Sequence, residues 1–184
     1  MQSGIEFLRA QVEQAASIHS SLLKSMTYHE SEANDARYRD LCDRHLPRMR
    51  EHQVHLEQLR QTLGGPSGSN PPAELVGAVR KAAGSAMGVV QSLADAPQSD
   101  YQRLAGDLDL VRRLEVIFKT FRDAGRSLHL DTLAKLGEIA ERHHDEYSAD
   151  AKRLLLAMFI ERAHSAADVV REASADGRVD SRIS

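Results

Sequence analysis

Apolar residues recur at steps of three and four along most of the chain, which is the spacing of one face of an α-helix. The first such stripe covers residues 5–31 and carries His19 at one of its positions. It ends in a polar run in which Asn34 or Asp35 can cap a new helix with its side-chain oxygen. The pattern therefore predicts a first helix over residues 5–31 and a second helix that starts directly after the cap.

The second predicted helix continues to about Leu63 and has His52 on its apolar stripe. Pro47 lies inside this segment, so we expect a kink in the helix or a short break before it. A stretch rich in glycine and proline follows at residues 64–72. Glycine commonly ends a helix, and this stretch is the one clear linker in the sequence.

The second half of the chain predicts three more helices. A short one, diluted by glycine, is expected over residues 73–94. A longer one is expected over residues 98–124 with Glu115 on its apolar stripe, and the last one starts after a turn at residues 125–129. From residue 173 onward the sequence is polar and predicts a frayed tail.

This order of elements predicts an all-α fold. Two hairpins joined by one long crossover give a four-helix bundle with ferritin-type connectivity, with the short extra helix in the crossover. Trp is absent and aromatic residues make up only 4% of the chain, whereas good helix formers dominate. We expect one bundle domain over residues 1–172 and a flexible C-terminal tail over residues 173–184.

Charge and cysteine content exclude several classes of function. The net charge is −3 with both signs interspersed, so no basic surface for nucleic acid is expected. No apolar run is long enough to cross a bilayer, and the N-terminus has no apolar signal core. The single Cys42 excludes a disulfide framework within the chain. These features favour a cytoplasmic protein that contacts neither nucleic acid nor membrane.

Ionisable residues lie on or beside the apolar stripes of all four long helices. Measured from the common end of the bundle at the rise of an α-helix, they fall within about one to two turns of the same height. The members of this predicted polar layer are His19, His52, Glu115, Glu141 and His144. A buried carboxylate or imidazole is costly unless it is paired or bound to a metal. The layer is therefore either a set of paired polar groups without metal or a metal site.

Glu141 and His144 form a Glu-x-x-His pair, whose spacing puts both side chains on one helix face. With the stretches HLPRMREHQVHLEQLRQTLGG, LVRRLEVIFKTFRDAG and DTLAKLGEIAERHH, the pair makes the chain resemble the ferritin-like superfamily. The closest likeness is to small bacterial ferritin-like proteins, often associated with stress. The resemblance covers residues 5–165 and implies a di-iron site.

The resemblance also implies which residues would hold the metal. Glu115, Glu141 and His144 match the ligands of the second hairpin. In the first hairpin Glu51 matches a carboxylate, but Val54 replaces its histidine partner, which leaves His52 or His55 as substitutes. Helix one offers His19 where a glutamate is expected. A set this rich in histidine suits a mononuclear site for iron or zinc.

Two functions follow from this sequence. One is a ferritin-like, metal-binding protein with iron or zinc and without clear enzymatic activity. The other is a structural or interaction bundle whose polar layer is a vestige that holds no metal. A haemerythrin-like carrier ranks lower because its histidine spacings are not assembled. The apolar face within residues 73–94 must cover its own bundle or a second copy of the chain, so a homodimer is expected.

Overall fold

The computed structural model describes residues 4–64 and 99–175, and every regular element in these ranges is a helix. Helix α1 is Gly4–Glu32, α2 is Ala36–Thr62, α4 is Asp100–Ser127 and α5 is Asp131–Ala175. The all-helical class and the four long helices predicted from the sequence are confirmed. The expected short helix at residues 73–94 lies outside the described residues.

Side-chain caps fix where two of the helices begin. Asp35 caps α2 by accepting a hydrogen bond from the backbone N–H of Arg37 at 2.9 Å. Ser99 and Gln102 form a reciprocal capping box at the start of α4. Asp35 is one of the two caps expected from the sequence, and α2 then continues as one unbroken helix through Pro47.

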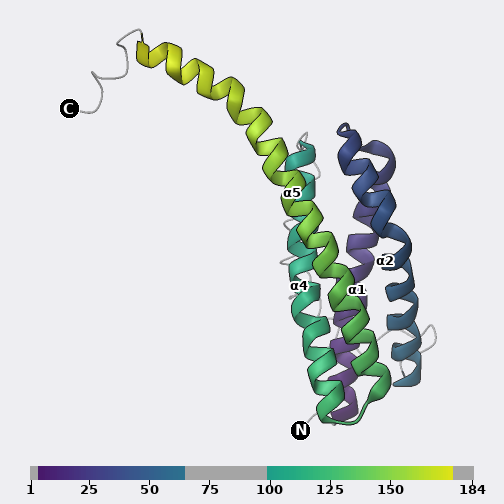
Figure 1. Ribbon diagram of the computed structural model, residues 1–184. Helices are drawn as coiled ribbons and strands as arrows, with labels where there is room; N and C mark the ends of the chain where they lie inside the picture. The colour runs from purple at the N-terminus through teal and green to yellow at the C-terminus, as the bar shows by residue number, and fades with distance from the viewer. Residues whose placement is uncertain (1–3, 65–98, 176–184) are drawn as a thin grey trace.

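The helices form two antiparallel hairpins, α1 with α2 and α4 with α5, which lie side by side along most of their length (Figure 1). Across the hairpins α1 packs against α4 and α2 packs against α5. At one end the carboxylate of Asp100 accepts a hydrogen bond from the backbone N–H of Asp35 at 2.7 Å. This bond ties the start of α4 to the turn between α1 and α2.

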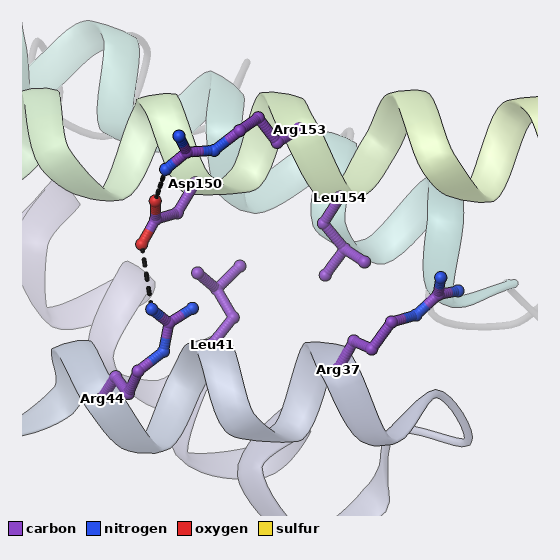
Figure 2. A pocket seen from close by; sticks show the side chains of 6 residues that line it. All are labelled: Arg37, Leu41, Arg44, Asp150, Arg153 and Leu154. Atoms are coloured by element: carbon purple, nitrogen blue, oxygen red, sulfur yellow. Dashed lines mark hydrogen bonds and ion pairs between the residues drawn. The ribbon is translucent and has the colours of Figure 1, made fainter.

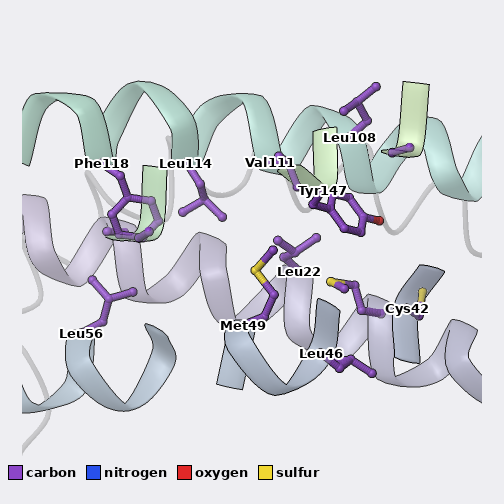
Figure 3. Packing of buried hydrophobic residues seen from close by; sticks show 14 of the residues in the cluster. Leu22, Cys42, Leu46, Met49, Leu56, Leu108, Val111, Leu114, Phe118 and Tyr147 are labelled. Atoms are coloured by element: carbon purple, nitrogen blue, oxygen red, sulfur yellow. The ribbon is translucent and has the colours of Figure 1, made fainter. Parts of the chain in front are cut away.

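The core runs along the axis between the four helices (Figure 3). At one end of the view Phe118 of α4 lies at the level of Leu56 of α2, and at the other end Leu108 lies at the level of Cys42. Residues 108, 111, 114 and 118 are all buried, with spacings of three and four. The prediction that Glu115 lies on this stripe is wrong: Leu114 occupies the core position, and Glu115 is half-buried beside it.

Two glycines allow α4 and α5 to approach each other closely. A Cβ added at Gly137 would lie 2.3 Å from the backbone nitrogen of Arg122, and one added at Gly125 would lie 2.5 Å from the backbone nitrogen of Ala134. Gly125 is therefore buried inside α4 and is not part of the turn, contrary to the expectation from its sequence position. The turn contains His129 with a positive φ of 56°.

Helix α5 extends well past the ends of the other three helices (Figure 1). It is helical to Ala175, so residues 173–175, expected to belong to the tail, continue the helix. Close to the point where it leaves the bundle, Leu156 and Phe159 are 60% and 57% exposed. Among the described residues no helix is long and apolar enough to cross a membrane.

Candidate functional site

Three histidine side chains from three helices meet in the core. They are His19 of α1, His52 of α2 and His144 of α5, with exposed fractions of 0%, 1% and 0%. The centre of the His19 ring lies 6.1 Å from that of His52 and 5.5 Å from that of His144, and the remaining pair is 5.8 Å apart. We call these three side chains the histidine cluster. All three belong to the polar layer predicted from the sequence.

One nitrogen of each ring has a hydrogen-bond partner. Nδ1 of His144 donates to the backbone carbonyl of Ala140 at 2.7 Å. Nδ1 of His19 lies 3.1 Å from the side-chain oxygen of Gln53 and donates to it. Nε2 of His52 lies 2.9 Å from Nδ1 of His143, a half-buried side chain at the edge of the bundle.

The other nitrogen of each ring has no partner. Nε2 of His19, Nδ1 of His52 and Nε2 of His144 are buried and make no hydrogen bond. Because the first two partners are acceptors, the hydrogens of His144 and His19 lie on Nδ1, and Nε2 carries a lone pair. When His52 donates to His143, its Nδ1 is left with a lone pair too. Nε2 of His19 and Nε2 of His144 thus carry unshared lone pairs inside the core, and Nδ1 of His52 carries a third in the tautomer in which His52 donates to His143.

Burial keeps these imidazoles neutral. It lowers the pKa of His19 to about 4, with a further lowering from the neighbouring His52. Burial also lowers the pKa of His52 and of His144 to about 3, and in each case a second ring of the cluster adds to the effect. At neutral pH all three rings are therefore free to act as lone-pair donors.

Phe118 of α4 closes the side of the cluster that the three histidine-bearing helices leave open. Its ring centre lies 5.0 Å from that of His144 and 6.3 Å and 6.4 Å from those of His19 and His52. The fourth helix therefore contributes an aromatic ring to this layer, where the sequence analysis expected the carboxylate of Glu115.

The remaining predicted ligands lie outside the cluster. Glu51 and His55 on α2 are exposed, whereas His52 between them is buried. Glu141 is half-buried and forms an ion pair with Arg122. The Glu-x-x-His spacing is present, but its glutamate is committed to an arginine and only its histidine reaches the core.

Within residues 4–64 and 99–175, no set of three or more His, Cys, Asp or Glu side chains is already arranged to hold a metal ion. The three rings of the histidine cluster lie next to one another, but their nitrogen atoms are not arranged around one common position. Their planes are inclined to one another at 81°, 61° and 32°. A bound ion would require these rings to turn.

A second buried polar group lies nearer the turn between α1 and α2. The carboxylate of Asp107 accepts hydrogen bonds from Ser25 at 2.5 Å, Tyr38 at 2.6 Å and His29 at 3.2 Å. It therefore joins α1, α2 and α4 through three donors. Asp107 is not among the residues predicted from the sequence, although its position four residues before Val111 puts it on the apolar stripe of α4.

Two further histidines, His29 and His45, are buried. His29 bonds Asp107, and His45 bonds Asp150 through Nε2 at 3.1 Å. Both have carboxylate partners, so their burial is compensated by a hydrogen bond and requires no ligand. The hydroxyl of Tyr147, by contrast, is buried without a hydrogen-bond partner.

A surface pocket of about 350 Å³ lies between α2 and α5, away from the histidine cluster (Figure 2). Three arginines and Asp150 line it around a floor of Leu41 and Leu154. The carboxylate of Asp150 forms ion pairs with Arg44 and Arg153, and Arg37 pairs with Asp35 and Glu161. Because each guanidinium already has a carboxylate partner, the pocket does not select an anion, and the histidine cluster is the stronger candidate.

Comparison with known proteins adds no assignment to this geometry. A scan against models of protein families, a search of curated proteins and a search of solved structures each find no match.

Proposed function

We propose that this bundle binds one transition-metal ion between His19, His52 and His144. The proposal is carried by the three buried ring nitrogens that have no hydrogen-bond partner. Buried polar atoms nearly always have a partner, so three unpaired atoms in one cluster point to a ligand held between them. A neutral imidazole with one nitrogen fixed by a hydrogen bond and the other free is the usual form of a histidine ligand.

The spacing of the rings supports the same proposal. Imidazole nitrogen binds zinc at about 2.0–2.1 Å, which puts each ring centre roughly 3.2 Å from the ion. Three rings placed trigonally around one ion then have centres roughly 5.5 Å apart. The separations of 5.5, 5.8 and 6.1 Å in the histidine cluster are close to this value. Rotation of the rings, with little movement of the helices, would complete the site.

The proposal includes a ferritin-like arrangement of the four helices but not a ferritin-like metal centre. The packing of α1 on α4 and of α2 on α5, with the long connection between hairpins, is the arrangement such a bundle would have. A di-iron centre is not proposed, because bridging carboxylates would have to lie between the metals and Glu51 and Glu141 lie elsewhere.

Thermal unfolding of the full chain, stripped with a chelator and then titrated with single metal ions, tests the proposal. An ion that binds only the folded state at 100 times its dissociation constant stabilises by about 2.7 kcal/mol. For a chain of this size that corresponds to a rise in Tm of roughly 5–10 °C. We expect such a rise with at least one imidazole-preferring transition ion and none with magnesium.

Variants on α2 provide matched controls. His52→Leu should abolish the metal-dependent rise in Tm, whereas Glu51→Gln and His55→Asn, one and three residues away on the exposed side, should retain it. A chain whose Tm responds to none of the ions would contradict the proposal. So would a chain that loses its response in the Glu51 and His55 variants and keeps it in His52→Leu.

The second candidate function is a structural or interaction bundle with a polar layer and no metal. The observation that favours it is the edge-to-face contact of the imidazoles with one another and with Phe118, which lets neutral rings pack as aromatic groups. In that case replacing His52 by leucine should leave the metal-free protein as stable or more stable.

A further inference from the structure

The donor set of the histidine cluster is uncharged. His19, His52 and His144 contribute neutral nitrogens, and the fourth helix contributes the ring of Phe118. Glu141, three residues before His144 on α5, is held by Arg122, and Glu146, two residues after it, is held by Arg48. An ion between the three rings would thus keep its whole charge inside the core, without an anionic ligand to offset it.

The charge of the ion therefore determines the free-energy cost of placing it between the three rings. The cost of moving an ion from water into a medium of low dielectric constant rises with the square of its charge, so a divalent ion faces about four times the penalty of a monovalent one. Zinc sites in proteins usually offset their charge with thiolate or carboxylate, or with a bound water in an open fourth position. Here the fourth side is closed by Phe118, which supplies neither.

The number of nitrogen ligands in the cluster also favours a monovalent ion. Zinc and ferrous ions prefer four or more ligands, whereas three nitrogens are all that the cluster offers. A monovalent d¹⁰ ion is stable with two or three ligands and accepts imidazole readily. The layer next to the cluster is apolar and contains the buried thioether of Met49, one turn before His52 (Figure 3). This environment favours a soft ion of low charge.

From the donor set, its charge and its closed fourth side we infer that the histidine cluster takes a cuprous ion in preference to any divalent ion. The inference rests on the proposed function and specifies its ligand. The ion is bound by three imidazoles alone, with His52 coordinating through Nδ1 because its Nε2 is engaged by His143.

The test uses the full, metal-free chain under anaerobic conditions. Cuprous ion is supplied with ascorbate and competed against bicinchoninate, and zinc is competed against a colorimetric zinc chelator in a parallel titration. We expect one cuprous ion per chain, bound about 100- to 1,000-fold more tightly than zinc. X-ray absorption at the copper edge should show a three-coordinate cuprous ion with nitrogen ligands only.

Glu115→Gln provides the decisive variant, because Glu115 is the half-buried carboxylate that the sequence analysis placed in this layer. It should bind cuprous ion within about threefold of the unaltered chain. A large loss of affinity in this variant, or zinc bound as tightly as cuprous ion, would overturn the inference while leaving a metal site in place. If neither copper nor any divalent ion binds, the proposed function itself is wrong.

Discussion

At the scale of single residues, each ring of the histidine cluster is fixed by a neighbour outside it. Ala140 fixes His144 through a backbone carbonyl, so no side-chain substitution can remove that bond. Gln53 and His143 fix the other two rings through side chains that lie closer to solvent. His144 and His19 are consequently each held in one tautomer even without a ligand, and the unshared lone pairs on their Nε2 atoms are a property of the folded chain.

This arrangement predicts that the metal-free protein is sensitive to mild acid. In the unfolded chain each histidine takes up a proton near its ordinary pKa of 6.5, whereas burial lowers the pKa of the folded groups to about 3 or 4. Below pH 6.5 the unfolded state therefore binds more protons, and stability falls as the pH falls. With three groups the slope near pH 5 is about 4 kcal/mol per pH unit.

Urea unfolding of the chelator-treated chain between pH 7 and pH 5 measures this slope. His19→Leu removes one of the three groups and should lower the slope by about a third. A free energy of unfolding that stays constant over this interval would mean that the rings are protonated in the folded state, and would contradict the buried, neutral cluster.

At the scale of helices and turns, much of the structure follows from local patterns. The start of α2 was predictable because Asp35 caps it within its own sequence neighbourhood. Which side chains of a helix are buried was harder to predict. Successive residues of α4 are about 100° apart around the helix axis, so an apolar stripe is wide enough to place either Leu114 or Glu115 toward the core. Packing against the other helices selects the leucine, and this long-range effect is absent from the sequence pattern.

Long-range packing also limits how much of the candidate site could be predicted from the sequence. The common height of His19, His52 and His144 was predictable from helix length alone, and the three rings do meet. That Glu141 turns to Arg122 depends on how α5 is rotated against α4, which the spacing of the pair does not reveal. Gly125 was expected in a turn because glycine is frequent there, whereas its actual role depends on a helix that packs over it.

The close approach of α4 and α5 yields a prediction with a built-in control. Gly137→Ala would place a Cβ 2.5 Å from the backbone carbonyl oxygen of Phe118, where no side-chain rotation can relieve the clash. We expect a loss of about 1–3 kcal/mol from the forced separation of the helices. Because Phe118 would move, metal affinity should fall as well.

Gly106→Ala is the matched change on the same hairpin. Gly106 is exposed on α4, and an added Cβ there would meet nothing within 4 Å. In a helix this substitution should stabilise by about 0.5–1 kcal/mol. Chemical denaturation compares the two variants, and equal effects of the same sign would show that the close approach of α4 and α5 does not limit stability.

At the scale of the whole molecule, α5 divides into two parts. Up to Met158 its residues contribute to the shared core, and beyond that the helix leaves the bundle (Figure 1). Arg37 on α2 reaches Glu161 with two bonds of 2.6 and 2.8 Å, close to the point where the contact ends. The homodimer expected from the sequence remains a prediction, and the extended end of α5 gives a way to test it.

Hydrogen exchange along α5 measures whether its extended part is covered. A single helix without packing opens readily in water, so amides of residues 165–175 of the isolated chain should exchange close to the rate of an unprotected peptide. Amides of residues 133–158 should exchange only through opening of the bundle. If a second copy covers the exposed Leu156 and Phe159, protection will instead extend past residue 160 and will grow with protein concentration. Phe159→Glu should then remove that added protection and leave residues 133–158 unchanged, because the side chain is 57% exposed in the single chain and takes no part in its core.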